Sequence, residues 1–283
     1  MESELSYILK LLDDPDTTVQ KAIKKYVQRY NGDMSQALAK ERLSLTASEK
    51  HLLTHYTHAG RKEHIIKHWQ VPTRFLSTNS SDWDTFEYLL SLISDFLHDG
   101  ISPRKRMSDA VDTLADEALV EDASQNADML AKFLFSSGRL TGNKTSYFAK
   151  HNSDLAWVIE SSIGNPISLC IIYMLLGNRF GLEVYGCNYP GHFLAWVNGS
   201  EKSYLVDTYN RARILDPNEI IQKNPSISEA ARDALQGPCS FSTILQRVLS
   251  NLETSFTKDG MPQESEFFSQ LKHSLVTTSD LPS

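Results

Sequence analysis

Residues 165–180 constrain the fold more than any other part of this sequence. Asn165 and Pro166 combine a side-chain cap with a proline at the first helical position, which is typical of a helix start. The residues that follow are apolar almost all the way round a helix: Ile167, Leu169, Cys170, Ile171, Ile172, Met174, Leu175 and Leu176. A helix with so little polar surface is buried. The sequence therefore predicts a central helix, running to about Phe180, that other elements must surround.

Three strands are predicted directly after this helix, at about residues 183–189, 192–197 and 204–208. They are rich in valine, tyrosine, phenylalanine and tryptophan, and the pairs Pro190-Gly191 and Asn198-Gly199 punctuate them. Strands joined by such short turns pair in antiparallel order. We therefore expect an α+β fold, in which the central buried helix packs on an antiparallel sheet and the N-terminal half is helical.

The first 70 residues are expected to form short helices. Apolar residues from Val19 to Tyr30 follow at spacings of four, four and three, which defines one face of a helix. Asp14 followed by Pro15 predicts the start of that helix. The LLDDPD turn before it is similar to a HEAT-type helical hairpin, but a stacked solenoid needs about three repeats and only one is present.

Changes in composition predict four regions along the chain. Residues 1–76 form an N-terminal helical region, and residues 77–140 form a helical subdomain that opens with a polar break at 77–84. Residues 141–241 form the core that contains the buried helix and the strands. Residues 242–283 form C-terminal helices, divided near Gly260.

The charge and cysteine content exclude several classes of protein. The chain has 283 residues and a net charge of −7, which argues against nucleic-acid binding and against a polybasic membrane surface. It has no run of about 20 apolar residues and no basic leader before its first apolar residues. Its three cysteines form no zinc motif, and an odd number cannot pair completely. We expect a cytoplasmic protein with free thiols and no cofactor, and we predict no oligomeric state.

Five of the nine histidines lie within residues 51–68. His51 and His55, and likewise His64 and His68, are four residues apart and share a helix face. Either a metal site or a polar helix surface would produce this pattern. The segment contains no cysteine, and its carboxylates show no ligand motif. A polar surface without a metal is the favoured interpretation.

His192 and Asp207 are the first candidates for chemistry. A hairpin loop of residues 198–201 would place His192 opposite Asp207, and any even loop length keeps both on one face of the sheet. A carboxylate beside an imidazole fixes its tautomer and raises its basicity, as in catalytic triads. A pair that merely holds the hairpin together would show the same spacing.

A triad also needs a nucleophile, and the start of the buried helix is its natural place because the helix dipole favours a thiolate there. Pro166 occupies that position and has no nucleophilic group. Ser168 and Cys170 are the nearest substitutes, but Cys170 lies about 6 Å further along the axis. A cysteine within an apolar run is usually an inert core residue.

The possible site therefore has two parts. If the protein is an enzyme, its catalytic residues are Cys170, His192 and Asp207. The residues that would line a groove beside them lie at the helix start and next to the pair: Asn165, Pro166, Ser168, Tyr189, Trp196, Tyr209 and Arg211. Ordinary packing at strand edges is the alternative role for each of the groove residues.

Four stretches resemble the SirB-type family of bacterial transglutaminase-like proteins: residues 141–159, 164–196, 204–215 and 242–252. The second stretch is the most specific, with GNPISL at the helix start, RFGL at its end and NYPGHFL around His192. The resemblance covers about residues 85–275. A related segment also occurs in an F-box protein of the ubiquitin system.

The resemblance implies a papain-like core without the usual nucleophile. Active transglutaminase-like enzymes open the helix with Gly-x-Cys, where this chain has Gly164, Asn165 and Pro166. The base and its orienting carboxylate map to His192 and Asp207. Loss of a triad nucleophile costs a factor of about 10⁴ or more in rate. The resemblance thus favours a non-catalytic regulatory module that binds a protein, a peptide or a small ligand. A cysteine-dependent amidase, protease or transglutaminase that uses Cys170 stays open as the alternative.

Overall fold

The computed structural model describes residues 3–77 and 81–276, and the chain divides into two compact units. Unit 1 comprises Met1–Gln70 and Ser91–Arg106, and unit 2 comprises Val71–Leu90 and Met107–Ser283. Part of the polar break expected at 77–84, and the end of the expected C-terminal region, lie outside the described residues. Within those described ranges, no helix is both long and apolar enough to cross a bilayer.

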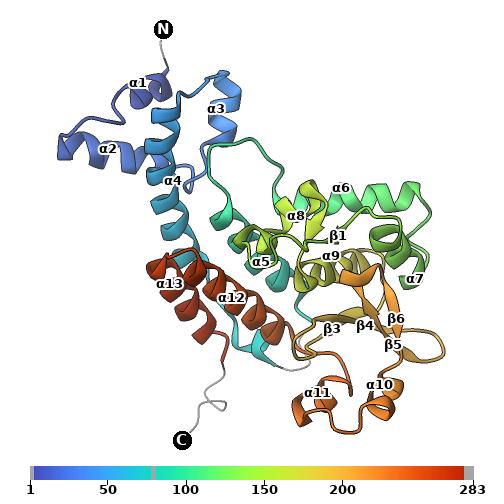
Figure 1. Ribbon diagram of the computed structural model, residues 1–283. Helices are drawn as coiled ribbons and strands as arrows, with labels where there is room; N and C mark the ends of the chain where they lie inside the picture. Colours follow the sequence, from blue (N-terminus) through green and yellow to red (C-terminus); the bar gives the residue numbers. More distant parts are fainter. Residues whose placement is uncertain (1–2, 78–80, 277–283) are drawn as a thin grey trace, which may run out of the picture. The chain divides into compact units, whose positions relative to one another are not determined.

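Unit 1 is helical. It contains α1 (Glu4–Lys10), α2 (Thr17–Gln28), α3 (Ser35–Glu41), α4 (Ala47–His68) and the second half of α5 (Trp83–Leu97). Figure 1 draws the first four of these helices in blue. Their apolar side chains share one core, which includes Leu5, Ile23, Val27, Met34 and Leu53. The histidine-rich segment lies within α4, so it forms one continuous helix.

The second helix begins two residues later than the sequence predicts. Pro15 does not open it; α2 starts at Thr17, and Asp16 caps it by accepting a hydrogen bond from the Thr18 N–H at 2.6 Å. The Asp14 carboxylate instead accepts a bond from the Asp16 N–H at 2.8 Å, in the turn before the helix. Both aspartates are suitable caps, and the turn that Asp14 forms leaves the capping position to Asp16.

Two glycines in unit 1 allow main-chain segments to approach closely. Gly32 has a φ of +79°, and a Cβ there would lie 2.7 Å from the carbonyl carbon of Gly60 and nearer still to main-chain atoms of Thr57 and Arg61. Arg61 is buried and donates to the carbonyls of Phe96 and Gly32, both at 3.2 Å. Its burial lowers the pKa of Arg61 to about 10, so the guanidinium remains charged at neutral pH.

Unit 2 arranges shorter helices around one buried helix and two small sheets. Its helices are η1 (Thr73–Leu76), the first half of α5, α6 (Met107–Val120), α7 (Ala127–Ala131), the π-helix η2 (Lys132–Ser136), η3 (Lys150–Ser153), α8 (Leu155–Ser161), α9 (Pro166–Arg179), η4 (Thr208–Asn210), α10 (Pro217–Lys223), α11 (Glu229–Ala234), α12 (Phe241–Lys258) and α13 (Pro262–His273). Strands β1 (Thr141–Gly142) and β2 (Ile163–Gly164) form a two-residue parallel pair.

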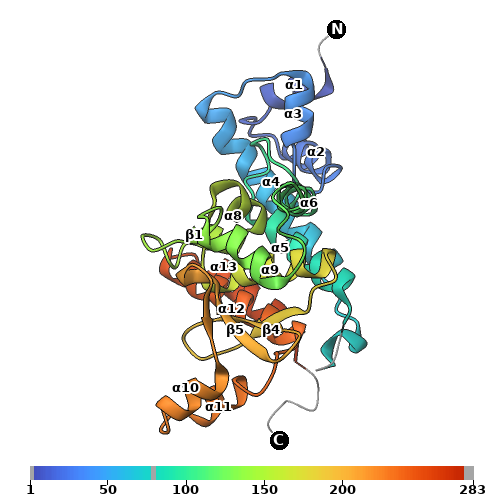
Figure 2. The ribbon, with the colours of Figure 1, turned by 90° about the vertical axis from the view of Figure 1, so that its right-hand side faces the viewer.

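The main sheet is antiparallel and contains four strands in the order β3-β4-β5-β6. They are β3 (Val184–Cys187), β4 (Leu194–Asn198), β5 (Ser203–Asp207) and β6 (Arg213–Leu215). Helix α9 lies on one face of the sheet, and α10 and α11 lie on the other (Figures 1 and 2). Cys187, Leu194, Trp196 and Leu205 pack against Leu235 in the core beneath α10 and α11. The sequence missed β6, since three residues are too few to show an alternating pattern.

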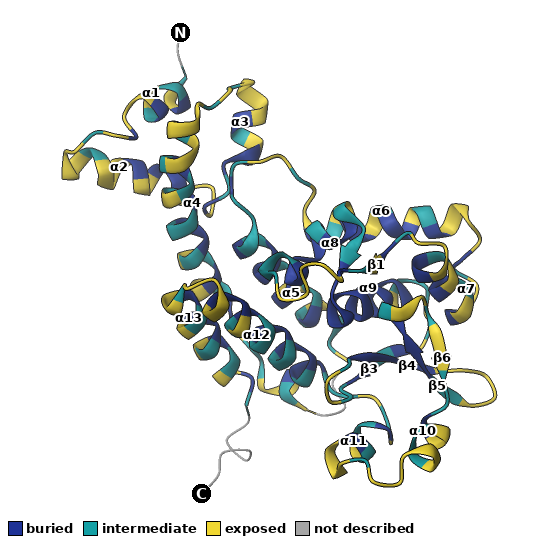
Figure 3. Ribbon diagram, in the orientation of Figure 1, coloured by how far each residue is buried: buried dark blue, intermediate teal, exposed yellow. Residues whose placement is uncertain are grey.

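Helix α9 is buried from Pro166 to Gly177, as the sequence predicts, and it is dark blue along this length in Figure 3. Its first turn has a reciprocal cap: Asn165 Oδ1 accepts from the Ser168 N–H (2.9 Å), and Ser168 Oγ accepts from the Asn165 N–H (3.0 Å). The cap satisfies main-chain donors that burial would otherwise leave without partners. It thereby fixes where the helix begins.

The β4–β5 hairpin loop comprises residues 199–202, one residue later than the 198–201 loop that the sequence suggests. Asn198 stays in the ladder opposite Ser203 because its Oδ1 accepts hydrogen bonds from Trp196 Nε1 and Ser203 Oγ, both at 2.9 Å. The pairing is therefore shifted by two residues, and β4 begins after His192. The loop still has an even number of residues, so the face on which the sequence places His192 and Asp207 does not change.

Candidate functional site

His192 and Asp207 meet at the end of the sheet where β4 begins and β5 ends. His192 Nε2 lies 2.8 Å from Asp207 Oδ1. At this ion-pair distance the ring N–H is not aligned for a linear hydrogen bond. Gly191, with a φ of +78°, turns the chain just before the histidine, and the His192 N–H donates to the Tyr189 carbonyl at 3.2 Å. A tight turn, and not the strand itself, therefore positions the imidazole.

The Asp207 carboxylate is buried and held by several donors. Asn210 donates to it twice, from its main-chain N–H to Oδ1 at 3.1 Å and from Nδ2 to Oδ2 at 2.8 Å. Burial raises the pKa of Asp207, but the contact with His192 and the bonds from Asn210 lower it more, so the pKa lies below its ordinary value. The carboxylate is thus ionised at neutral pH and fixed in orientation.

This geometry leaves one ring nitrogen of His192 for other partners. Nε2 faces the buried carboxylate, whereas 31% of the histidine side chain is exposed. A carboxylate beside Nε2 favours the tautomer that carries the proton there, so Nδ1 is the nitrogen that can accept a proton or a hydrogen bond. Chemically, the pair can act as a base or as a hydrogen-bonding anchor for a ligand.

The residues predicted at the helix start serve to cap and pack the helix. Pro166 is the first residue of α9 and is buried, and its carbonyl accepts a bond from Thr208 Oγ1 at 3.4 Å. Asn165 and Ser168 are buried and engaged with each other, since Ser168 Oγ also donates to the Asn165 carbonyl at 3.0 Å. Ser168 Oγ is therefore occupied on both its donor and its acceptor side.

Cys170 lies in the core between α9 and the sheet. Its thiol donates to the Leu194 carbonyl at 3.4 Å and lies 4.0 Å from the Tyr185 carbonyl. Complete burial raises the pKa of Cys170 well above its ordinary value. Burial also raises the pKa of Cys187 and of Cys239 to about 12. All three cysteines are free thiols, and their environments disfavour the reactive thiolate.

Tyr209 is the groove candidate whose ring contacts that of His192. Its ring lies edge-on to the His192 ring, with 6.3 Å between centroids, and its hydroxyl donates to the Asn143 carbonyl at 3.0 Å. A Cβ on Gly142 would lie 2.6 Å from the Tyr209 ring, so β1 packs directly on this side chain. Tyr147, from the loop after β1, also meets the Tyr209 ring edge-on, with 6.1 Å between the ring centroids.

Sequence reasoning missed the network that holds this loop. Asn143 Nδ2 donates to Asn152 Oδ1 at 2.9 Å, and Asn143 Oδ1 accepts from the Ser146 N–H at 3.0 Å. Asn152 Nδ2 in turn donates to the carbonyls of Ser146 (2.8 Å) and Tyr147 (2.9 Å). Both asparagines are buried. Both asparagines lie within residues 141–159, which resemble the SirB-type family. That resemblance is the sequence signal that could have pointed to them.

The remaining groove candidates differ in their surroundings. Trp196 is buried in the core beneath α10 and α11, and Tyr189 packs at the border of the same core. Arg211 is exposed in the turn between η4 and β6. Arg211 and Ala212 have φ values of +59° and +58°, an uncommon pair of left-handed residues without glycine. The Arg211 carbonyl accepts a bond from Ser136 Oγ at 3.1 Å, which helps to hold this turn.

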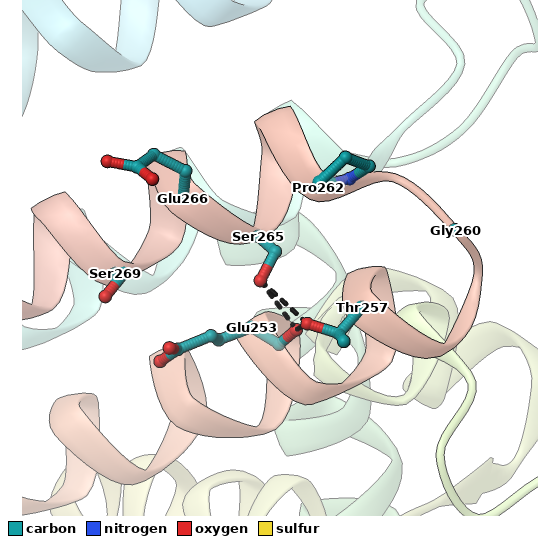
Figure 4. A pocket seen from close by; sticks show the side chains of 7 residues that line it. All are labelled: Glu253, Thr257, Gly260, Pro262, Ser265, Glu266 and Ser269. Carbon is teal, nitrogen blue, oxygen red and sulfur yellow. Dashed lines mark hydrogen bonds between the residues drawn. The ribbon is translucent and has the colours of Figure 1, made fainter.

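Two hollows in unit 2 lie elsewhere. One, of about 410 Å³, lies between α12 and α13 and is lined by polar side chains that bond to one another, such as Ser265 and Thr257 (Figure 4). The other, of about 490 Å³, lies beside the β4–β5 loop and α7. Among residues 3–77 and 81–276, no group of three or more histidines, cysteines or carboxylates is arranged to hold a metal ion. Within α4, the rings of His64 and His68 lie beside each other, with centroids 4.4 Å apart.

Comparison with known proteins identifies the family. The family model described as the transglutaminase-like superfamily matches residues 104–250, and the chain belongs to that superfamily. The protein therefore has an α+β fold with a transglutaminase-like core and a helical N-terminal region. No solved structure matches it.

Three relatives show how far the similarity extends. A UPF0162 protein from Xylella fastidiosa is 32% identical over 131 residues, which are 44% of this chain and 47% of the relative. A UPF0162 protein from Vibrio cholerae is 24% identical over 144 residues, 48% of this chain and 53% of the relative. F-box only protein 21 from Mus musculus is 26% identical over 152 residues, 51% of this chain and 24% of the relative. The chain thus spans about half the length of these bacterial relatives and about a quarter of the F-box protein.

Replacing Asp207 by asparagine is expected to destabilise the protein by about 1–3 kcal/mol at pH 7, because a buried hydrogen-bonded carboxylate is lost. It should also reduce the fall in the free energy of unfolding that the wild type shows as the pH is lowered. A lowered pKa in the folded state stabilises the protein fully above the unfolded pKa of about 3.9, and this contribution is lost as the pH falls through the folded pKa. Urea unfolding at several pH values between 6 and 2 measures both effects.

Asn210→Ala is the matched control for this prediction. It removes one donor to the carboxylate and keeps the charge, so the folded pKa of Asp207 should rise, and the stability lost in acid should be smaller and completely lost at a higher pH than in the wild type. Parallel acid curves for the wild type and Asp207→Asn would show that this carboxylate has no such role.

Proposed function

We propose that this protein is a SirB-type transglutaminase-like module that binds an extended peptide or small ligand beside His192 and Asp207, without cysteine catalysis. The observation that carries the proposal is Pro166 at the first position of α9. A nucleophile at this position would benefit from the helix dipole and from the unpaired N–H groups of the first turn. Proline provides neither a nucleophile nor an N–H group.

The state of Cys170 supports the same proposal. A displaced nucleophile would have to ionise and reach the imidazole, yet the thiol is directed to the Leu194 carbonyl and is fully buried. The His192 side chain remains 31% exposed beside the buried carboxylate, and its Nδ1 faces away from that contact through Nε2. A regulatory role through a protein or peptide partner is part of this proposal.

The test is native-state labelling of the three cysteines with iodoacetamide from pH 5 to 9, measured by mass spectrometry. We expect Cys170 to stay unlabelled until the chain is unfolded in urea, because its pKa is raised and it has no access to solvent. Cys187 and Cys239 serve as internal controls, and the unfolded chain gives the rate of the free thiols.

The labelling of His192→Ala separates the two candidate functions. Fast modification of Cys170 at pH 6 that disappears in this variant would establish a thiolate–imidazolium pair and overturn the non-catalytic proposal. Identical, slow labelling in the wild type and the variant is the expected outcome.

A further inference from the structure

A row of aromatic rings, exposed at its far end, leads away from the His192–Asp207 pair. From His192 it runs to Tyr209, then to Tyr147 and then to Phe148, with ring centroids 6.3, 6.1 and 5.1 Å apart. Tyr147 is 40% exposed and Phe148 is 52% exposed. Neighbouring exposed aromatic side chains beside a candidate site are typical of a binding surface.

The row is held in place and is not a loose loop. The Tyr209 hydroxyl donates to the Asn143 carbonyl, and Nδ2 of the buried Asn152 donates to the Tyr147 carbonyl. Each ring meets the next at an angle of 76–81°, which is the edge-to-face arrangement that aromatic pairs prefer. A partner that binds here therefore needs to order little of this surface, which favours affinity.

The row ends at a positive charge. Lys258, the exposed last residue of α12, places its ammonium 3.2 Å from the centroid of the Phe148 ring. Among the described residues, Lys258 has no carboxylate within 4.0 Å, whereas nearby Lys150 lies 3.6 Å from Asp259. This ammonium is therefore available to an anionic partner.

The turns that border the pair add more cations. Lys144 follows Asn143, whose carbonyl holds Tyr209, and Arg213 is the cross-strand neighbour of Asp207. These two side chains and that of Arg211 are exposed, and within the described ranges none has a carboxylate partner. In a chain with a net charge of −7, a row bordered by unpaired cations favours an acidic ligand.

We propose that this row binds an extended acidic peptide segment of a partner protein, with aromatic or leucine side chains alternating with Asp or Glu. The proposal rests on the function proposed above and names the class of ligand. Alternate side chains of an extended strand are about 6.6 Å apart, close to the 6.3 and 6.1 Å steps of the row. Successive apolar side chains of such a peptide can therefore lie on successive rings while its carboxylates meet the cations.

Fluorescence anisotropy with three labelled heptapeptides tests the proposal on the full chain. The first probe is Asp-Phe-Glu-Leu-Asp-Phe-Glu, the second has lysine at every acidic position, and the third has serine at every apolar position. We expect the first to bind about tenfold more tightly than either of the others, with an affinity that falls as salt is added.

Two variants locate the binding on the row. Phe148→Ser and Lys258→Glu should each weaken the first probe about five- to tenfold, and both positions are exposed, so the fold should tolerate them. Lys223→Glu is the matched control: it reverses an exposed charge on α10, beneath the opposite face of the sheet, and should leave the affinity within about twofold.

The outcomes separate this inference from the proposed function. Suppose that the acidic and lysine peptides bind equally, and that His192→Ala weakens this binding but Lys258→Glu does not. This result would overturn the proposal of an acidic ligand but would leave the proposed binding function standing. Tighter binding of a labelled ten-residue oligothymidine would assign the row to nucleic acid and also overturn the inference. Failure of all three peptides to bind would overturn the inference and the peptide part of the proposed function together.

Discussion

Gly32→Ala is expected to destabilise unit 1 by more than about 3 kcal/mol. Two costs add together at this position. The φ of +79° puts an alanine in the left-handed region, which costs roughly 1–2 kcal/mol. The new Cβ would also meet main-chain atoms of Thr57, Gly60 and Arg61, which belong to one rigid helix and cannot rotate away.

Chemical denaturation followed by circular dichroism measures the loss, and hydrogen exchange locates it. Amides of α2, α3 and α4 should exchange faster in Gly32→Ala, whereas those of α9 should keep their wild-type protection. Gly181→Ala is the matched control, since Gly181 has a similar φ of +68° but no atom within 4 Å of the place that a Cβ would take. It should cost only about 1 kcal/mol. An unchanged denaturation midpoint in Gly32→Ala would contradict the close packing described for unit 1.

Tyr173→Ala is expected to destabilise unit 2 by about 3–5 kcal/mol. Tyr173 is completely buried on α9, its ring packs edge-on against Phe135 at 5.8 Å, and its hydroxyl donates to the Ala127 carbonyl at 2.7 Å. Truncation leaves a large cavity beside the helix that positions the candidate site. It also removes the hydrogen bond to the Ala127 carbonyl.

Tyr173→Phe separates the two contributions. It keeps the ring and removes only the hydroxyl, so it should cost about 0.5–1.5 kcal/mol from the lost hydrogen bond to the Ala127 carbonyl. Urea unfolding of both variants gives the difference. A phenylalanine variant as unstable as the alanine variant would mean that the hydrogen bond, and not the packing, accounts for the whole effect.

The central part of the fold could be predicted because its cause is local. Pro166 after a capping asparagine, followed by an apolar run, predicts a buried helix whatever surrounds it, and the structure has α9 there. Strands β3, β4 and β5 could be predicted for a similar reason, because turn residues mark their ends in the sequence. Strand β6 and the Asp16 cap escaped prediction because three residues show no period and because two neighbouring aspartates cap equally well on sequence alone.

The surroundings of the His192–Asp207 pair depend on contacts between distant residues. Tyr209 bonds to a carbonyl 66 residues earlier in the chain, and Asn210 holds the carboxylate from a short helix that no pattern marks. Tyr147 stands beside Tyr209 only because two buried asparagines fold the loop that carries it. Spacing in one sequence predicts that two residues share a face, but not which third residue the fold brings beside them.

The nearly all-apolar surface of α9 has a consequence during synthesis. The helix leaves the ribosome before β3–β6, which supply the sheet on which it packs. At about 5–20 residues per second, the interval from residue 179 to residue 215 lasts roughly 2–7 s. For that time the nascent chain exposes the apolar face of the helix that the sheet covers in the folded protein. The segment around Leu175 is therefore where a chaperone should bind the growing chain, and where slow elongation should promote aggregation.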